Sequence, residues 1–304
     1  MALHPTVAGF LATLPHHEHG PVDPHALRVE EAGQVTPLED RLPVHSVEDR
    51  DANGVPVRVI TPAGADQVGI IVYFHGGAFL RGSLETHDHI ARELANATGM
   101  RVVLVDYRLA PEHAFPAALD DCATVVRWAV SPEAGLAWDG TTLALAGDSS
   151  GGNFVAVTAA DLLDAGFNQV THQVLLYPSV DLDFDETRYA SLRENAVGYG
   201  LETAGLKYHN AFYLDGGADP ADPRVSPIKR DDLAGLPQAL VVTAEYDPLR
   251  DEGEAYAERL RAAGVPAITR RWEGAQHGFV QFFGWVPEFH PVYDEVAQFL
   301  RGGK

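Results

Sequence analysis

The sequence predicts an α/β protein with a mostly parallel sheet of eight strands flanked by helices. From about residue 41, short β-branched apolar runs alternate with longer segments of helical period, which is the pattern of this fold class. Five of the runs are almost continuously apolar, as is typical of strands buried on both faces. The chain has 304 residues, 46% hydrophobic and 21% charged, which is enough for one large α/β unit with a sizeable core.

The first two strands are expected to form an antiparallel hairpin. They lie near 41–50 and 55–62, and the turn-prone sequence Asp51-Ala52-Asn53-Gly54 separates them. The later strands are spaced for crossover helices, so they are expected to be parallel. They lie near 69–75, 101–107, 141–147, 172–178, 239–245 and 267–273.

Helices are expected between the later strands and after the last one. They lie near 84–98, 114–130, 150–165, 249–263 and 288–301. Two segments do not fit this alternation. Residues 1–40 are rich in His and Pro, and residues 183–228 contain a helical candidate near 203–214 followed by a loop rich in Gly, Pro and Asp.

Charge and cysteine content exclude several classes of protein. Lys and Arg number 22 against 43 Asp and Glu, and the formal net charge of -21 repels phosphates and anionic lipid headgroups, so neither nucleic acid nor a membrane is an expected partner. Cys122 is the only cysteine, which excludes an intrachain disulfide and Cys-rich zinc sites. The N-terminal apolar run lacks a preceding Lys or Arg, and no apolar stretch is long enough to span a membrane, so we expect a cytoplasmic location.

A Gly-x-Ser-x-Gly pentapeptide, Gly147 to Gly151, stands between a predicted strand and a predicted helix. In such a nucleophile elbow, a sharp strand-to-helix turn exposes the central serine above the sheet, so Ser149 is the candidate nucleophile. Ser150 is disfavoured because Asp148, and not glycine, lies two residues before it. The same residues are similar to the serine region of chymotrypsin-like proteases, but those are all-β, whereas this chain has the βαβ pattern and a single cysteine.

A second motif, His75-Gly76-Gly77-Ala78-Phe79, directly follows the apolar strand GIIVYF. In hydrolases with a nucleophile elbow, the loop at this place supplies backbone N–H groups to the oxygen that becomes negative during the reaction. Residues without bulky side chains leave room for a substrate to approach this loop.

Five motifs in this order resemble the hormone-sensitive-lipase-like family of α/β-hydrolases. They are HGGAF at 75–79, VDYRLAPEHAFPAALDD at 105–121, GDSSGGN at 147–153, YDPLRDEG at 246–253 and QHGF at 276–279. The resemblance implies an α/β-hydrolase fold in which residues 41–304 form the catalytic domain. Residues 1–40 and 183–228 would then form a small helical cap over the active site, at the carboxyl edge of the sheet.

The resemblance also assigns the site residues. Asp247, just after the strand 239–245, is expected to be the acid, and His277, in the glycine-rich loop after the last strand, is expected to be the base. Asp251 and Glu245 are rival acids, and His290 is a rival base. The N–H groups of the oxyanion hole are assigned to Gly76, Gly77, Ala78 and Ser150.

The sequence departs from the family at Ala78, where a third glycine is usual. Alanine tolerates fewer backbone conformations than glycine. We therefore expect Ala78→Gly to cost about 0.5–1 kcal/mol in loop order, from the greater unfolded-state entropy of glycine.

These residues predict a serine carboxylic-ester hydrolase that acts through an acyl-enzyme on Ser149. The resemblance implies small-molecule esters with short to medium acyl chains and no cofactor. An amidase or deacetylase with the same three residues is an alternative. A non-catalytic ligand receptor on this fold is another, although such receptors lose the catalytic histidine. A homodimer is compatible with the sequence.

Two groups of histidines could suggest a metal site, which we do not expect. His16, His17 and His19 lie in a proline-bounded loop. His87 and His89 lie on a predicted helix, where residues two apart do not share a face.

Overall fold

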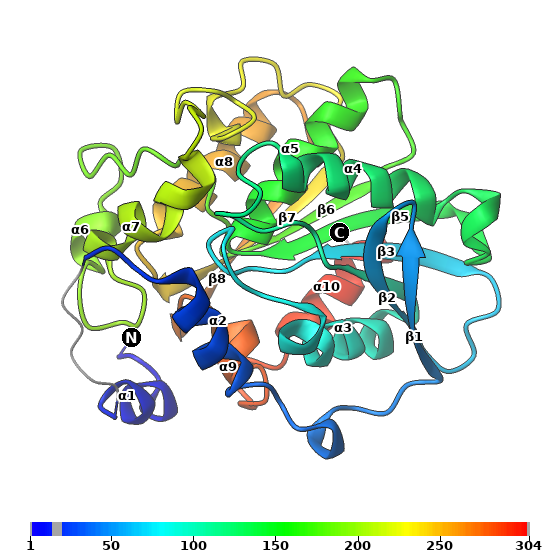
Figure 1. Cartoon of the computed structure of the whole chain (residues 1–304), viewed down its shortest axis with the longest axis horizontal. Coiled ribbons are helices and arrows are strands. Elements are labelled where there is room, and N and C mark those ends of the chain that lie inside the picture. The colour runs from blue at the N-terminus through cyan, green and yellow to red at the C-terminus, as the bar shows by residue number, and fades with distance from the viewer. Residues whose placement is uncertain (1, 14–19, 303–304) are drawn as a thin grey trace.

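Eight strands form one central sheet in the computed structural model, which describes residues 2–13 and 20–302 (Figure 1). The order of the strands is β1-β2-β4-β3-β5-β6-β7-β8, with β2 antiparallel to both β1 and β4 and all other neighbours parallel. The predicted fold class is therefore confirmed. The strands are β1 (Ser46–Ala52), β2 (Val55–Thr61), β3 (Val68–Phe74), β4 (Arg101–Val105), β5 (Trp138–Asp148), β6 (His172–Leu176), β7 (Gln238–Tyr246) and β8 (Ala267–Gln276).

The first hairpin forms as predicted, but its first strand begins later. Asn53 and Gly54 at the turn both have positive φ, 56° and 93°, and the Asp51 carboxylate accepts the N–H of Gly54. Residues 41–45 are outside β1. The Arg41 side chain is engaged with the carbonyl of Thr36, and a proline at 43 has no N–H for a strand ladder.

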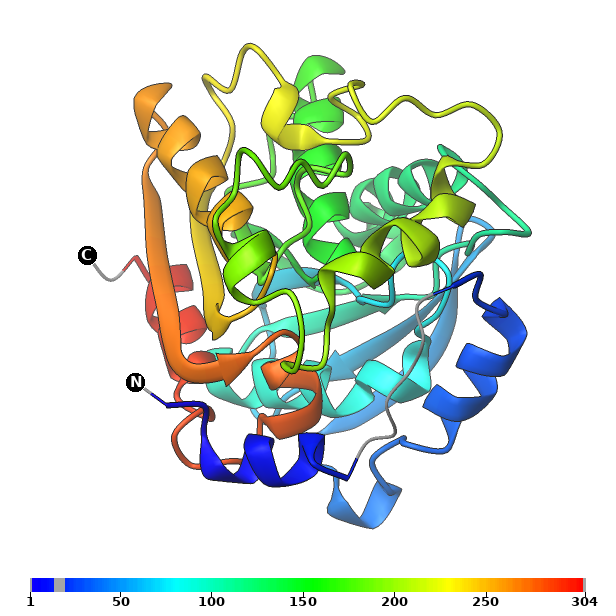
Figure 2. The same cartoon turned by 90° about the vertical axis from the view of Figure 1, so that its left-hand side faces the viewer.

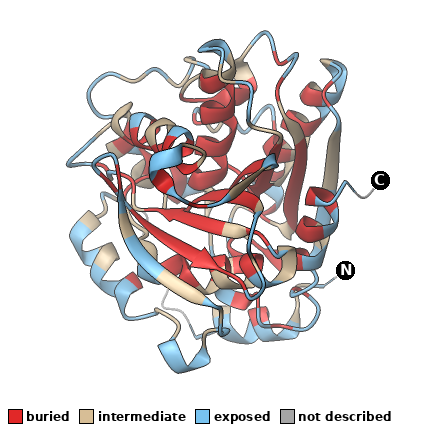
Figure 3. Ribbon diagram, turned by 90° about the vertical axis from the view of Figure 1, so that its right-hand side faces the viewer, coloured by how far each residue is buried: buried red, intermediate tan, exposed pale blue. Residues whose placement is uncertain are grey.

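Side chains of the central strands alternate between two apolar cores, one on each face of the sheet. Ile70, Val72 and Phe74 belong to the core with α4 (Ala117–Ala129), α5 (Ser150–Asp164) and α8 (Arg250–Ala262). Ile71 and Tyr73 belong to the core with α3 (Leu84–Thr98) and α10 (Val292–Leu300). Figures 1 and 3 show these two helical layers and the buried strands between them. Burial on both faces explains why these strands lack polar alternation.

The long helices lie within four residues of their predicted bounds, and α3 and α7 (Thr203–Leu214) match them. Proline accounts for the two late starts, because Pro116 precedes α4 and Pro291 precedes α10. His290 consequently lies before the last helix and not inside it. The sequence analysis missed the short helices α1 (Pro5–Leu11), α2 (Pro24–Ala32), α6 (Ser191–Glu194) and α9 (Phe279–Phe283), and the 3-10 turns η1 (Leu38–Asp40), η2 (Pro132–Ala134) and η3 (Pro227–Lys229).

Helices α1, α2, α6 and α7 gather at the carboxyl edge of the sheet, which faces the viewer in Figure 2. One arginine holds α2 there. Arg28 donates to the carbonyls of Leu80 and Ala110 (2.7 and 2.8 Å) and pairs with both carboxylate oxygens of Glu112 (2.8 Å each). The Arg28 guanidinium lowers the pKa of Glu112 to about 2. Helix α2 is thus tied to the loops that follow β3 and β4.

A buried carboxyl group joins α8 to the loop after β6. Oε1 of Glu252 accepts the N–H groups of Val180 and Asp181 (2.8 and 3.2 Å), and the side chain is fully buried. Burial raises the pKa of Glu252 well above its ordinary range, and the Asp181 carboxylate adds to the shift.

This burial predicts a pH-dependent effect of Glu252→Gln. The folded protein binds the Glu252 proton more tightly than the unfolded chain does, so the group favours folding at low pH. Its contribution declines as the pH rises above about 4.3, the ordinary pKa of a glutamate. Glutamine keeps the accepting oxygen and cannot ionise. The Tm of the variant relative to wild type should therefore rise between pH 5 and pH 9, as measured by circular dichroism.

Glu258→Gln, at an exposed position of the same helix, is the matched control for the loss of one carboxyl group. A Tm difference between Glu252→Gln and wild type that stays constant over this pH range would contradict the prediction.

Candidate active site

Ser149 stands at the turn between β5 and α5, in a conformation that few side chains adopt. Its φ and ψ are 54° and -119°. The flanking glycines permit the turn, because a Cβ on Gly151 would lie 2.0 Å from the carbonyl oxygen of Phe74, and one on Gly147 would lie 2.5 Å from the carbonyl oxygen of Gly151. The N–H of Ser149 donates to the carbonyl of Leu176 at the end of β6 (2.8 Å).

The structure brings the three predicted site residues together. Nε2 of His277 lies 2.9 Å from Oγ of Ser149, and Nδ1 of the same ring lies 2.8 Å from Oδ2 of Asp247. Asp247 follows β7 and is fully buried, and its second oxygen accepts the N–H of Leu249 (2.8 Å). Tyr177 packs edge-on against the His277 ring, with 5.1 Å between centroids. The histidine therefore bridges the hydroxyl and a buried carboxylate.

The rival residues point elsewhere. Asp251 lies on α8 and accepts the N–H of Ser191 (2.8 Å). Glu245 lies on β7 and accepts the N–H of Gly274 (2.8 Å). The ring of His290 lies 3.3 Å from the Glu93 carboxylate.

The loop after β3 lines the same cavity as Ser149 through Gly77 and Ala78. In the described part of the chain, the N–H groups of Gly77, Ala78 and Ser150 make no hydrogen bond. Gly77 has a φ of 130°, and a Cβ there would lie 2.2 Å from the carbonyl oxygen of Arg81, so this position requires glycine. The prediction for Gly76 is wrong, because its N–H donates to Oδ1 of Asp148 (2.9 Å) and is already used.

Asp148 binds the backbone of this loop, a contact that the sequence did not predict. Its Oδ1 accepts the Tyr73 hydroxyl (2.8 Å) in addition to the N–H of Gly76, and Nε2 of His87 lies 3.5 Å away. Burial of Asp148 disfavours its charged form, but His87 and the Tyr73 hydroxyl bring its pKa below the ordinary value. Asp148 is therefore a buried carboxylate, directly next to Ser149 in the chain.

His75 supports the same loop without carrying a charge. Its Nδ1 lies 2.8 Å from the carbonyl oxygen of Gly76, and Tyr107 stacks on its ring at 4.2 Å and donates to its carbonyl (2.6 Å). Burial, reinforced by the nearby His87, lowers the pKa of His75 to about 3. The imidazole is neutral at ordinary pH.

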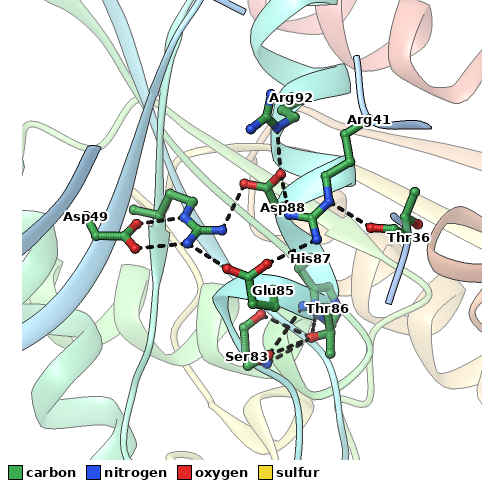
Figure 4. A network of polar contacts seen from close by, with 10 residues as sticks. Thr36, Arg41, Asp49, Ser83, Glu85, Thr86, His87, Asp88 and Arg92 are labelled. Carbon is green, nitrogen blue, oxygen red and sulfur yellow. Dashed lines mark hydrogen bonds and ion pairs between the residues drawn. The ribbon is translucent and has the colours of Figure 1, made fainter. Parts of the chain in front are cut away.

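An ion-pair network anchors the helix that carries His87 (Figure 4). Asp88, the next residue, is fully buried and accepts from three arginines: Arg41 (2.8 Å), Arg58 (3.1 Å) and Arg92 (2.6 Å). These arginines come from the segment before β1, from β2 and from α3 itself. Because three donors satisfy this carboxylate, α3 is held in one position on the sheet, and His87 is presented to Asp148.

A cavity of about 100 Å³ lies above Ser149. One wall consists of the loop after β3 and of Tyr177 and His277. Segments outside the central α/β layers supply the other wall. These residues are Glu31, Leu201, Leu206, His209 and Asn210.

Asn195 connects the segment that bears α6 to the turn that bears Asp247. Its side-chain N–H₂ donates to the carbonyls of Glu245 and Asp247 (3.2 and 3.0 Å). No pattern in the sequence indicated this contact.

Neither a metal cluster nor a membrane span is found among residues 2–13 and 20–302. No group of three His, Cys, Asp or Glu residues there could hold a metal ion, and no helix there is long and apolar enough to cross a bilayer. His87 and His89 have different neighbours, Asp148 and the carbonyl of Gln281. His16, His17 and His19 lie outside the described residues.

An eight-stranded sheet with a serine at the β5–α5 turn, a histidine after the last strand and a carboxylate after β7 defines the α/β-hydrolase class. The family model described as the alpha/beta hydrolase fold matches residues 71–281. Among curated proteins, an arylesterase of Saccharolobus solfataricus is 41% identical over 227 residues, covering 74% of this chain and 73% of the relative. The carboxylesterase NlhH of Mycobacterium tuberculosis is 40% identical over 256 residues, covering 81% and 79%.

Solved structures agree with these relatives. A hyperthermophilic esterase from the archaeon Pyrobaculum calidifontis has a TM-score of 0.92 at 38% identity, covering 99% of each chain. The chain belongs to the hormone-sensitive-lipase-like family of α/β-hydrolases.

The backbone at Ala78 reverses the expected sign of Ala78→Gly. Ala78 has a φ of 53°, in the left-handed region, which costs an L-residue roughly 1–2 kcal/mol and costs glycine nothing. This relief exceeds the roughly 0.4–1 kcal/mol by which glycine favours the unfolded chain. We therefore predict that Ala78→Gly raises the free energy of unfolding by about 0.5–1 kcal/mol, as measured by urea denaturation.

The control is Ala255→Gly, inside α8, which should cost about 1 kcal/mol because glycine weakens a helix. Equal destabilisation by both substitutions would show that the φ of Ala78 stores no strain.

Proposed function

We propose that this protein is a serine carboxylic-ester hydrolase in which Ser149 is the nucleophile, His277 the general base and Asp247 the group that orients the histidine. The continuous contact from Ser149 through His277 to Asp247, at 2.9 and 2.8 Å, carries this proposal. Both distances lie within the range needed for proton transfer and for fixing the tautomer. The esterase and carboxylesterase names of the relatives support the same chemistry.

The reaction begins when Oγ of Ser149 attacks the acyl carbon of the ester and its proton passes to Nε2 of His277. The carbonyl oxygen becomes negative and accepts the N–H groups of Gly77, Ala78 and Ser150. The C–O bond then breaks, and the alcohol leaves with the proton from His277. Asp247 stays ionised throughout and stabilises the imidazolium.

The acyl group now remains bonded to Oγ of Ser149. A water molecule attacks this acyl-enzyme while His277 takes one of its protons. The Ser149–acyl bond breaks, the carboxylic acid leaves, and the proton returns to Ser149. The cycle consumes one water for each ester bond.

We propose small-molecule esters with short acyl chains as the substrates. The cavity of about 100 Å³ is small beside the roughly 300–1,000 Å³ of drug-sized ligand sites, which favours short chains over long ones. We assign residues 41–304 to the catalytic domain and residues 1–40 and 183–228 to a cap over the site. A matched 4-nitrophenyl ester and 4-nitroanilide would distinguish this activity from that of an amidase.

A cytoplasmic location and a homodimer are also proposals. The only cysteine, Cys122, is buried, and a single free thiol suits a reducing compartment. The side chains of Val29, Val197 and Trp285 are more than half exposed and offer apolar contacts to a second copy. Cell fractionation and sedimentation velocity test the two proposals.

Ser149→Ala should remove nearly all ester turnover and leave the fold intact, because neither His277 nor Ser150 can replace the lost hydroxyl. A fluorophosphonate probe followed by peptide mass spectrometry should label Ser149 in the wild type and nothing in the variant. Ser150→Ala is the matched control and should keep its label. Labelling at Ser150 in the Ser149→Ala variant would contradict the assignment of the nucleophile.

Asp247→Asn should lower kcat on the order of 10⁴-fold, as the analogous change does in chymotrypsin-like proteases, because the amide stabilises the wrong tautomer of the histidine. Asp251→Asn, four residues along the chain and tied to Ser191, should cost far less. Steady-state kinetics on one activated ester measures both. If Asp251→Asn had the larger effect, the acid would have to be reassigned.

A further inference from the structure

One arginine, Arg81, lines the cavity above Ser149, and no other Lys or Arg lines it among the described residues. It lies three residues after Ala78, and its N–H donates to the carbonyl of Gly77 (3.1 Å). Its Cγ would lie 3.0 Å from a Cβ built on Gly77, so the side chain starts beside the N–H groups proposed to hold the oxyanion. The Arg81 side chain thus forms part of the wall of the cavity above Ser149.

This guanidinium has no partner in the part of the chain that the structure describes. Its Nε is buried and makes no hydrogen bond there. Arg28, Arg41 and Arg58, by contrast, each pair with a carboxylate at 3.1 Å or less. A buried N–H of a charged group that lacks an acceptor is costly, and at the wall of a binding site a ligand can supply the acceptor.

The two carboxylates that line the cavity do not neutralise Arg81. Oδ1 of Asp148 accepts the Tyr73 hydroxyl and the N–H of Gly76. Glu31 is buried and accepts the N–H of Gly82 (2.8 Å). In the described structure, neither carboxylate forms an ion pair with Arg81, since no N···O distance between them is 4.0 Å or less.

We propose that Arg81 determines substrate specificity by binding a carboxylate on the substrate, so that the preferred substrates are short esters that also carry a free carboxylate. A planar guanidinium offers parallel N–H donors that match the two oxygens of a carboxylate. The net charge of -21 repels anions, so a local cation is needed to hold one. The inference rests on the proposed ester hydrolysis. With the carboxylate on the acyl half, the ester anion and water yield a dicarboxylate, an alcohol and one proton. With the carboxylate on the alcohol half, they yield a monocarboxylate, a hydroxycarboxylate and one proton.

Two matched substrate pairs test this inference and distinguish which half of the ester bears the carboxylate. For the acyl half, the pair is monoethyl succinate and ethyl 4-oxopentanoate. For the alcohol half, the pair is acetoxyacetate and acetoxyacetone. In each pair a carboxylate oxygen is replaced by a methyl group. The kcat/KM of each is measured by pH-stat for wild type, Arg81→Met and Arg81→Lys.

We expect the ratio of kcat/KM for the anionic ester to that for its neutral partner to fall at least tenfold in Arg81→Met, in one of the two pairs. Arg81→Lys keeps the positive charge but lacks the planar pair of N–H donors. Its ratio should therefore lie between those of Arg81→Met and wild type. Arg127→Met, at an exposed position on α4, is the control for removing one positive charge and should leave the ratios unchanged. Unchanged ratios in both pairs for Arg81→Met would overturn the inference.

A failure of the proposed function has a different signature. In that case wild type would hydrolyse none of the four esters, anionic or neutral. Calorimetry on Ser149→Ala with monoethyl succinate and acetoxyacetate, with and without Arg81→Met, still tests the inference. Binding that weakens at least tenfold with Arg81→Met supports the carboxylate site. Equal binding, or no binding to either protein, rejects it.

Discussion

The buried carboxylate of Asp148 is the constraint on which the site depends. It lies at the end of β5, next to Ser149, and takes the N–H of Gly76 from the loop after β3 and the hydroxyl of Tyr73 from β3 itself. The proposed nucleophile and the proposed oxyanion loop follow strands that neighbour one another in the sheet. Because the residue next to Ser149 binds the N–H of Gly76, the loop after β3 is tied to the turn that bears the serine. Hydrogen bonds from the Tyr73 hydroxyl and the N–H of Gly76 stabilise the charge of Asp148 in the buried position.

Helix α3 links Asp148 to β2 and to the segment before β1. His87 faces Asp148, while its neighbour Asp88 takes three arginines from three separate segments. An exposed ion pair contributes little to stability, but a buried carboxylate that loses its partners is strongly destabilising. A displacement of α3 would separate Asp88 from its arginines, so the ion pairs hold this helix in place. The physical role of this network is to fix the helix that carries His87, which contacts the buried carboxylate of Asp148.

Asp247, the proposed acid, is held by a different set of contacts. Asp247 is buried between β7 and α8, where Asn195 binds the carbonyl of its turn and Glu252 fixes the loop after β6. Helix α2 is tied by Arg28 to the loops after β3 and β4. Both walls of the cavity are thus bonded to the same loops that carry the reacting groups. This rigidity suits a reaction in which an oxyanion needs N–H donors already in place.

Much of the site was predictable because its motifs carry their own local geometry. Gly147 to Gly151 between a strand and a helix predicts a serine on a strained turn, and the φ of 54° at Ser149 is that strain. Chain order and the ends of strands placed Asp247 and His277. The assignment of Gly76 failed because a backbone N–H has no sequence signature for its acceptor. The sign that we predict for Ala78→Gly changes once the structure is known, because the cost of an alanine depends on a φ that only the folded loop has.

The sequence by itself determined the α/β class, the hairpin, the spans of the long helices and the residues of the elbow. All of these depend on periodicity, on turn residues or on short motifs, which act over a few neighbouring positions. Tertiary structure alone decided the contacts of Asp148, Asp88 and Glu252, and it left Arg81 at the cavity without a partner among residues 2–13 and 20–302. The physical reason is that most partners of these buried carboxyl groups lie tens of residues away along the chain. No local pattern records which donors will meet it.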